Sequence, residues 1–227
     1  MVDVGGVSAW EARSGEDGGR QRSEPARGQD VRARVGAMQI LWKCPITDER
    51  YVTERAWENA NLECCPFHAE GGCGLLKLGT YGRVKPAGVR VPRWWCPRQG
   101  ESISLLPSFL AARLSGTVAE VEDVVAKVEA AGGVAAAVDE ILPPDADKSI
   151  GLVGALRWIR RRVTAVRTAL LAIVTLEPEQ FRGVQPTLAG FREALSQKRV
   201  LVTLRELVER HLCALPVPLG FRARARG

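Results

Sequence analysis

The chain has 227 residues, of which 46% are hydrophobic and 26% are charged. This composition excludes a wholly disordered protein. No apolar run reaches the roughly 18 residues that a membrane span needs, so we expect no membrane association. The first residues lack the basic start and apolar run of a secretory signal. We therefore expect a cytoplasmic protein whose six cysteines are reduced or bound to a metal.

The formal net charge of +6 is unevenly distributed along the chain. Residues 1–38 are neutral, 39–107 carry +2, 108–147 carry −6 and 148–227 carry +10. A basic C-terminal block favours a polyanionic partner, of which nucleic acid is the commonest. Arginine-rich segments are also common on solvated helix faces, so composition leaves both interpretations open.

Two different patterns divide the first half of the chain. Residues 1–38 are rich in Gly, Ser, Arg and Glu without an apolar period, which predicts a disordered segment. Residues 39–107 are rich in cysteine, glycine and aromatic residues and form the first predicted domain. In it we expect a short helix at 53–61 and two strands, 75–84 and 89–96, joined by a tight turn.

From residue 108 onwards the spacing of apolar residues becomes helical. Thr117 is the expected N-cap of the first helix, and two glycines mark its end. The segment 215–227 contains prolines and a basic run, which predicts a disordered tail. The expected helices are 118–131, 134–142, 152–176, 187–196 and 198–212.

A group of metal-ligating side chains lies in the first domain. Cys65 and His68 have the spacing at which one tight turn offers two ligands to zinc. Cys73 follows two glycines that can turn the chain back, and Cys96 ends the second expected strand. We predict that zinc is bound by Cys65, His68, Cys73 and Cys96, with Cys64 as an alternative to Cys65.

Three other residues bear on this prediction. Position 99, where the second ligand of a pair would be expected, is Gln99, which is a poor zinc ligand. Either Cys73 supplies the fourth ligand or the site is degenerate. Cys44 and Cys213 are interpreted as small buried hydrophobic side chains. We favour a structural site over a catalytic one, because a catalytic site keeps three protein ligands, an open position and a general base, and Glu70 is the only acid close in sequence. A deaminase site is not expected, because the Pro-Cys-x-x-Cys run is missing.

Residues 65–114 resemble a group of bacterial zinc-ribbon proteins associated with transposases. The matching segments are Cys65-Pro-Phe-His68, Gly79-Thr-Tyr-Gly-Arg83, Arg90-Val-Pro-Arg-Trp-Trp-Cys96-Pro and Ser104-Leu-Leu-Pro-Ser-Phe-Leu110. In that group the ribbon precedes a helix-turn-helix, and the resemblance implies that the ribbon helps to bind DNA. The chain departs from the group at Gln99, where many relatives have a metal ligand, and at Ile103, where an aromatic residue is usual.

The long helix expected at 152–176 carries the candidate DNA-contacting side chains. At about 100° per residue, its arginines gather on the face opposite the apolar stripe, where guanidinium groups can reach phosphates and guanine edges. The segment resembles the recognition helices of transposase-type helix-turn-helix units, which implies that the helix at 134–142 is its partner. The candidate DNA-binding residues are Arg157, Trp158, Arg160, Arg161 and Arg167.

The predicted fold class is α+β: a small zinc β-ribbon at 39–107, an all-helical domain at 108–214 with a helix-turn-helix-like unit, and disordered termini. No catalytic set of carboxylates or histidines is found in the sequence, so we expect neither enzymatic activity nor a small-molecule substrate. We expect a non-catalytic, transposon-associated or transposon-derived protein that binds double-stranded DNA at the nucleoid. The alternative is a zinc-stabilised protein–protein interaction module, which the acidic helix at 118–131 favours.

Overall fold

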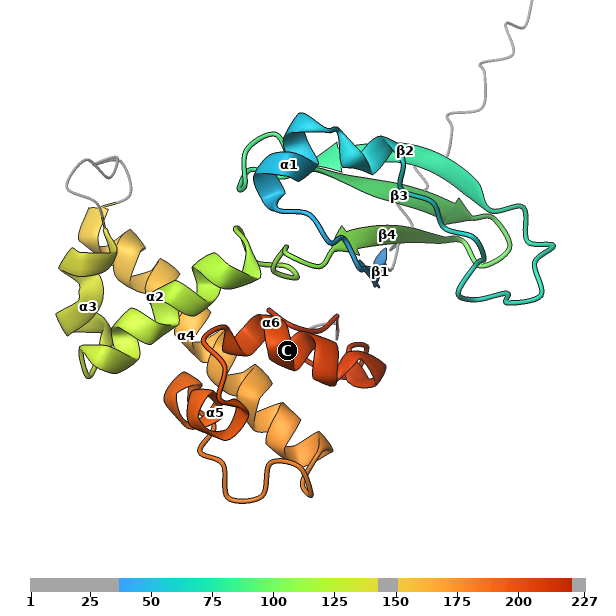
Figure 1. The fold of residues 1–227 in the computed structure, drawn as a ribbon. Coiled ribbons are helices and arrows are strands. Elements are labelled where there is room, and N and C mark those ends of the chain that lie inside the picture. The colour runs from blue at the N-terminus through green and yellow to red at the C-terminus, as the bar shows by residue number, and fades with distance from the viewer. Residues whose placement is uncertain (1–36, 143–150, 222–227) are drawn as a thin grey trace, which may run out of the picture. The chain divides into compact units, whose positions relative to one another are not determined.

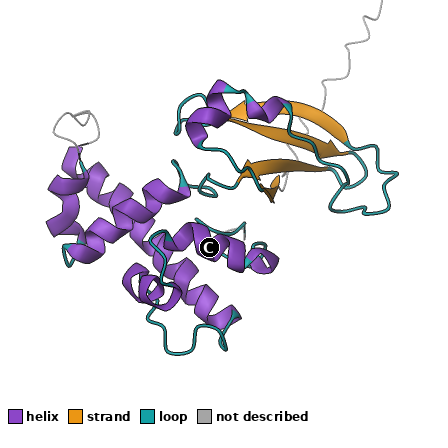
Figure 2. Ribbon diagram, viewed as in Figure 1, coloured by secondary structure: helices purple, strands orange, loops and turns teal. Residues whose placement is uncertain are grey.

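The computed structural model describes residues 37–142 and 151–221, and within these ranges it confirms the α+β class (Figure 2). The strands are β1 (Ala37–Trp42), β2 (Leu76–Gly82), β3 (Arg90–Cys96) and β4 (Glu101–Pro107). The α-helices are α1 (Asp48–Thr53), α2 (Val118–Ala130), α3 (Val134–Ile141), α4 (Gly151–Leu176), α5 (Leu188–Leu195) and α6 (Val200–Leu207). Two short 3₁₀-helices, η1 (Ala56–Glu58) and η2 (Glu209–His211), complete the described elements.

The four strands form one sheet in the order β1-β4-β3-β2. The two expected strands are confirmed as β2 and β3, which pair antiparallel, and β4 pairs antiparallel with β3. The strands β1 and β4 were not predicted, and they pair parallel to each other. Their partners lie 65 positions apart, as in Ala37 with Ser102, and no local sequence pattern reports such a pairing. The segment expected to be disordered, 1–38, therefore overlaps the start of β1.

The turn between β2 and β3 depends on a glycine. Gly88 has a φ of 79°, which a side chain would strain. A Cβ at this position would also lie 3.0 Å from the Val52 side chain of α1. The expected tight turn therefore brings β3 close to α1 (Figure 1). The Tyr51 hydroxyl of α1 donates a hydrogen bond to the carbonyl of Arg90 at 2.7 Å.

The expected helix at 53–61 is wrong in its position. The helix α1 begins earlier because the side chain of Thr47 accepts a hydrogen bond from the N–H of Arg50 and caps its N-terminus. Arg55 then takes a left-handed conformation with a φ of 49°, which separates α1 from η1. The predicted segment thus spans the end of one short helix and the whole of another.

The helices after residue 117 follow the predicted order. The side chain of Thr117 accepts a hydrogen bond from the N–H of Glu120, and the Glu120 carboxylate accepts one from the N–H of Thr117, which confirms the expected N-cap of α2. The helices α3, α4 and α5 lie within about a residue of their expected bounds. The last helix is shorter than expected, because α6 ends at Leu207 and continues only as η2.

Residues on both sides of the predicted domain boundary at 107/108 share one hydrophobic core. Buried side chains of α1, β3 and β4 belong to the same cluster as those of α2, α4, α5 and α6. Tyr51 and Leu106 represent the first group, and Val121, Leu170 and Leu201 the second. A smaller cluster of buried residues lies around the candidate metal ligands. Burial of this apolar surface holds the described part of the chain together.

The connection between β4 and α2 has only turns and one isolated bridge. Its carbonyl groups are satisfied by three arginine side chains from other elements, which compensates for the missing ladder. The three donors are Arg83, Arg162 and Arg205, and the acceptors are the carbonyls of Ser108, Leu110, Ala111, Leu114 and Ser115. These hydrogen bonds join the β2–β3 turn, α4 and α6 to this connection.

The predicted disordered tail at 215–227 is wrong for its first part. Leu215 and Leu219 are fully buried, and the N–H of Phe221 donates to the carbonyl of Leu212 at 2.7 Å. The leucines on either side of the two prolines pack into the core, and their burial outweighs the weak local propensity of this segment. The basic run at 222–226 lies outside the described residues.

None of the helices in the described ranges combines the length and the apolar character needed to cross a bilayer.

Candidate metal centre and basic surface

The structure brings the four predicted metal ligands together. Cys65 and His68 lie on one turn, in which the N–H of His68 donates to the carbonyl of Cys65 at 3.0 Å. Cys73 follows two glycines with φ values of 81° and 73°, which turn the chain back toward this pair. Cys96 is the last residue of β3. The ligand atoms of all four residues lie within 4.8 Å of one another.

The distances fit a tetrahedral ion. The Nδ1 atom of His68 lies 3.5 Å from the Sγ of Cys65 and 3.4 Å from the Sγ of Cys96. A zinc ion with Zn–S bonds of about 2.3 Å and a Zn–N bond of about 2.0 Å sets the N···S separation at about 3.5 Å. Three thiols and one imidazole can therefore hold one metal ion and leave no open coordination position.

The thiols lie in an apolar environment. Cys65, Cys73 and Cys96 are buried, and Trp94 and Ile103 pack in the same cluster. Burial raises the pKa of Cys65, but hydrogen bonds from His68, a backbone N–H and the other thiols lower it to about 7. Burial, followed by the neighbouring thiols, raises the pKa of Cys73. The cluster thus contains one thiol that readily becomes a thiolate, which is the form that binds a metal.

Gln99 has a supporting position beside the cluster. Its backbone N–H donates to the Sγ of Cys96 at 3.4 Å, and the N–H of Gly100 closes the turn on the carbonyl of Cys96. Hydrogen bonds of this kind orient a sulfur ligand and stabilise its charge. A ligand at position 99 is therefore not needed for a four-residue set, because Cys73 takes the fourth place.

The remaining cysteines differ from the expectations in one respect. Cys64 is exposed and does not belong to the cluster, so the structure favours Cys65 over its alternative. Cys44 is buried in the core, as expected. Cys213 is exposed, so its interpretation as a buried hydrophobic side chain is wrong. It lies in the turn after η2, whose apolar contacts are made by Leu212 and Leu215 instead.

The helix α4 has the expected amphipathic character. Ile159, Val163 and Val166 lie on its buried face. The opposite face is exposed and carries Arg157, Arg160, Arg161 and Arg167. Among residues 37–142 and 151–221, no acidic side chain forms an ion pair with any of these four arginines. Their guanidinium groups are therefore accessible to an anion.

Arg162 and Trp158 of α4 do not simply extend the exposed basic face. Arg162 is buried and donates to the carbonyl of Ser115 at 2.8 Å, and burial lowers its pKa to about 10. Its guanidinium carbon lies 3.6 Å from the ring centre of Trp158, so one face of that indole is covered from within the chain. The helical period by itself indicates that Arg162 is buried, because it lies three residues after Ile159 and four before Val166 on the apolar stripe.

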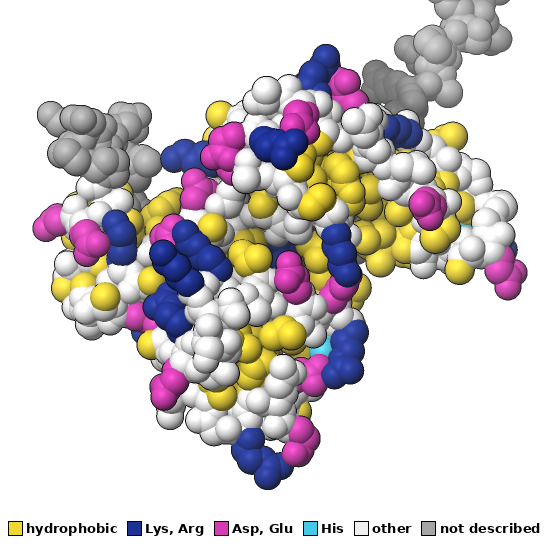
Figure 3. Space-filling view, viewed as in Figure 1, with side chains coloured by type: hydrophobic (Ala, Val, Ile, Leu, Met, Phe, Trp, Pro, Cys, Tyr) yellow, Lys and Arg dark blue, Asp and Glu magenta, His cyan; other side chains and the backbone are white. Residues whose placement is uncertain are grey.

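Lys and Arg side chains form several small groups on the face shown in Figure 3, with Asp and Glu side chains between them. No continuous basic surface covers that face. Positive charge on this face is therefore confined to separate groups of side chains.

The partner of α4 in the expected helix-turn-helix unit is α3. The two helices contact each other through buried residues of the main core, including Ala137 and Val138 of α3. The connection between them, 143–150, lies outside the described residues. A helix pair is therefore present, and its assignment as a helix-turn-helix stays a prediction.

The acidic residues of α2, which suggested a protein partner, contact the chain itself. Glu122 is 1% exposed and accepts hydrogen bonds from the N–H groups of Val200 and Leu201 at 3.0 and 2.9 Å. Glu129 caps α5 in the same way, and Asp123 forms an ion pair with an arginine that precedes α6. This role was not predicted from the sequence, because the residues around an acidic side chain do not indicate which helix N-terminus it contacts.

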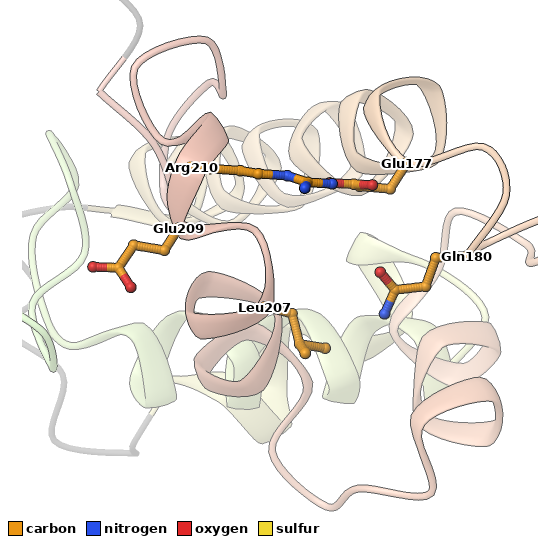
Figure 4. A pocket seen from close by; sticks show the side chains of 5 residues that line it. All are labelled: Glu177, Gln180, Leu207, Glu209 and Arg210. Carbon is orange, nitrogen blue, oxygen red and sulfur yellow. The ribbon is translucent and has the colours of Figure 1, made fainter.

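A hollow of about 580 Å³ lies between the end of α4 and the start of η2. Figure 4 shows Arg210 and Glu177 reaching toward each other along it, with Gln180 nearby and the Glu209 carboxylate directed away. The carboxylate of Glu177 accepts hydrogen bonds from Arg210 and His211, which lower its pKa. A carboxylate held in its charged form by two partners is a weak general base, so this hollow offers little to acid–base chemistry.

No family model, curated protein or solved structure matches the chain. The resemblance to transposase-associated zinc-ribbon proteins therefore rests on the sequence segments alone and stays a prediction.

Proposed function

We propose that the chain is a non-catalytic DNA-binding protein, associated with or derived from a transposon, in which zinc stabilises the ribbon and α4 contacts the duplex. Support for zinc comes from the donor set. Three cysteines and one histidine in a closed set are typical of structural zinc sites, whereas catalytic sites keep a position for water. Soft sulfur donors disfavour magnesium and calcium, which prefer oxygen.

The observation that carries the DNA-binding proposal is the exposed face of α4. Arg157, Arg160, Arg161 and Arg167 project from one side of a helix whose other side is anchored in the core. A helix anchored in the core holds these groups at a fixed spacing, so several can contact phosphates without ordering the backbone on binding. An α-helix also has the width to enter the major groove.

The test is the affinity for duplex DNA at several salt concentrations. Each phosphate contact contributes about 0.9 to the slope of log K against log salt. The triple variant R157A/R160A/R161A should therefore bind at least about tenfold more weakly near 0.1 M salt, with a slope smaller by up to roughly 3. The matched control R50A/R182A/R199A removes the same charge from exposed arginines that already pair with acids, and it should bind like the wild type.

Equal binding by the triple variant and the control would contradict the proposal, as would a wild-type chain without salt-dependent affinity for duplex DNA.

The second candidate function, a zinc-stabilised protein-interaction module, is favoured by one observation. Leu76 and Leu78 are about half exposed on β2, which forms one edge of the sheet. An exposed edge strand with apolar side chains is a common surface for pairing with another chain.

A further inference from the structure

The β2–β3 hairpin and its flanks form an uninterrupted basic segment. Six basic residues and no acidic residue lie between Gly71 and Gly100. The six are Lys77, Arg83, Lys85, Arg90, Arg93 and Arg98. The net charge of residues 39–107 is only +2, because the acidic residues of that region lie before and after this basic segment. Only Arg83 among the six donates to carbonyls of the connection before α2.

Part of this segment borders a hollow of about 460 Å³ beside η1. Its lining residues are Arg55, Trp57, Glu58, Lys77, Thr80 and Arg90. The register explains how the hairpin supplies three of them. Lys77 lies opposite Trp94 and Thr80 opposite Pro92, and Arg90 lies two residues before Pro92, so their side chains leave the same face of the sheet.

Hydrogen bonds hold the two basic side chains of the hairpin at the hollow. The Nε of Arg90 donates to the Oγ1 of Thr80 at 2.7 Å. The Nζ of Lys77 lies 3.3 Å from the carbonyl of Ala60 and 5.7 Å from the ring centre of Trp94. In the part of the chain that the structure describes, Lys77 and Arg90 pair with no acid. Both side chains are exposed and keep N–H groups for a ligand.

The acid of the hollow is already neutralised. The carboxylate of Glu58 forms an ion pair with Arg55 at 2.6 Å. The lining thus contains three basic groups and one acid, and Lys77 and Arg90 supply its net positive charge. A fork of guanidinium N–H groups, an ammonium group and a hydroxyl together match the oxygens of a phosphate group.

We propose that this hollow binds a phosphate of a nucleic-acid backbone and gives the protein a second contact with the nucleic acid, separate in sequence from α4. The hollow is open, which suits a phosphodiester within a continuous strand. The assignment of this phosphate to a nucleic acid rests on the proposed function. The ability of the hollow to bind a phosphate group does not depend on it.

The double variant R90Q/K77Q tests the proposal, with R50Q/R182Q as a matched control that removes two exposed arginines outside the hollow. Loss of one or two phosphate contacts should lower the slope of log K against log salt by roughly 1 to 2 and weaken duplex binding several-fold. Inorganic pyrophosphate should shift the backbone amide signals of residues 55–58, 77–80 and 90 in the wild type and the control, but not in the double variant. The single variant R90Q serves the same purpose if the double variant does not fold.

Duplex binding by R90Q/K77Q that equals the control overturns the nucleic-acid assignment, even if pyrophosphate shifts the amides of the hollow. A wild-type chain that binds no duplex contradicts the proposed function, and the pyrophosphate titration then decides on the hollow alone. Shifts confined to the hollow would support a phosphate site there. Their absence would overturn it.

Discussion

Arg205 is almost fully buried, and among the described residues no acid pairs with it. Its Nε donates to the carbonyl of Leu219, and its Nη1 donates to the carbonyls of Ser108 and Leu110 at 2.8 and 2.7 Å. Burial lowers its pKa to about 10, so it remains charged at neutral pH. Backbone dipoles, rather than a carboxylate, therefore balance this charge. One side chain thus joins the tail, α6 and the connection before α2.

The variant R205M should lower the free energy of unfolding by roughly 2–4 kcal/mol, because three buried carbonyls lose their donor. R205K should not restore stability, since an ammonium group lacks the fork that reaches separate carbonyls. Urea denaturation measures both effects. The exposed R160M is the control and should change stability by less than about 0.5 kcal/mol. An R205M protein as stable as the wild type would refute this account.

At the scale of elements, α2 organises the helices that follow it. Glu122 and Glu129 are separated by seven residues, so they lie on the same face of α2 two turns apart. Each carboxylate accepts two backbone N–H groups at the N-terminus of another helix, α6 for Glu122 and α5 for Glu129. Free N–H groups and the positive end of the helix dipole both favour a carboxylate there. The acidic charge of this region therefore positions neighbouring helices.

The variant E122Q should destabilise the protein by about 1–2 kcal/mol, because an amide offers one acceptor oxygen and no charge to the start of α6. E129Q should cost less, since Glu129 is only partly buried. D139N on the exposed face of α3 is the control. Thermal unfolding at neutral pH compares the three variants. Equal effects of E122Q and D139N would show that the cap contributes no stability.

At the scale of the whole molecule, the candidate metal centre lies outside the main hydrophobic core. The segment between η1 and β2 has no regular element, and its Cys65, His68 and Cys73 lie close to Cys96 at the end of β3. Only a small cluster of buried residues surrounds these candidate ligands. A metal ion can replace a large core in such a segment, because its binding energy contributes directly to folding. The main core instead joins α1, β3 and β4 to the helices after residue 117.

We expect one zinc ion per purified wild-type chain and none in C96S. Loss of the ion should lower the melting temperature by about 10 °C or more. Amide hydrogen exchange should accelerate at residues 61–75 and 96–100, while the helical far-UV signal persists. The control C64S removes an exposed neighbouring thiol and should keep its zinc. Metal content in C96S equal to that of the wild type would exclude the proposed ligand set.

Features set by neighbouring residues could be predicted from the sequence by itself. The N-cap at Thr117, the apolar stripe of α4 and the β2–β3 hairpin all depend on spacings of a few residues. The grouping of Cys65, His68, Cys73 and Cys96 could also be predicted, because two of them share one turn and the hairpin returns Cys96 to the other three. Tertiary structure alone decided the parallel pairing of β1 with β4, the burial of Leu215 and Leu219, and the role of Glu122. Backbone hydrogen bonds between distant strands do not depend on a particular side-chain pattern, so the sequence does not indicate which strands pair. The role of a charged side chain depends on the group that folding places next to it.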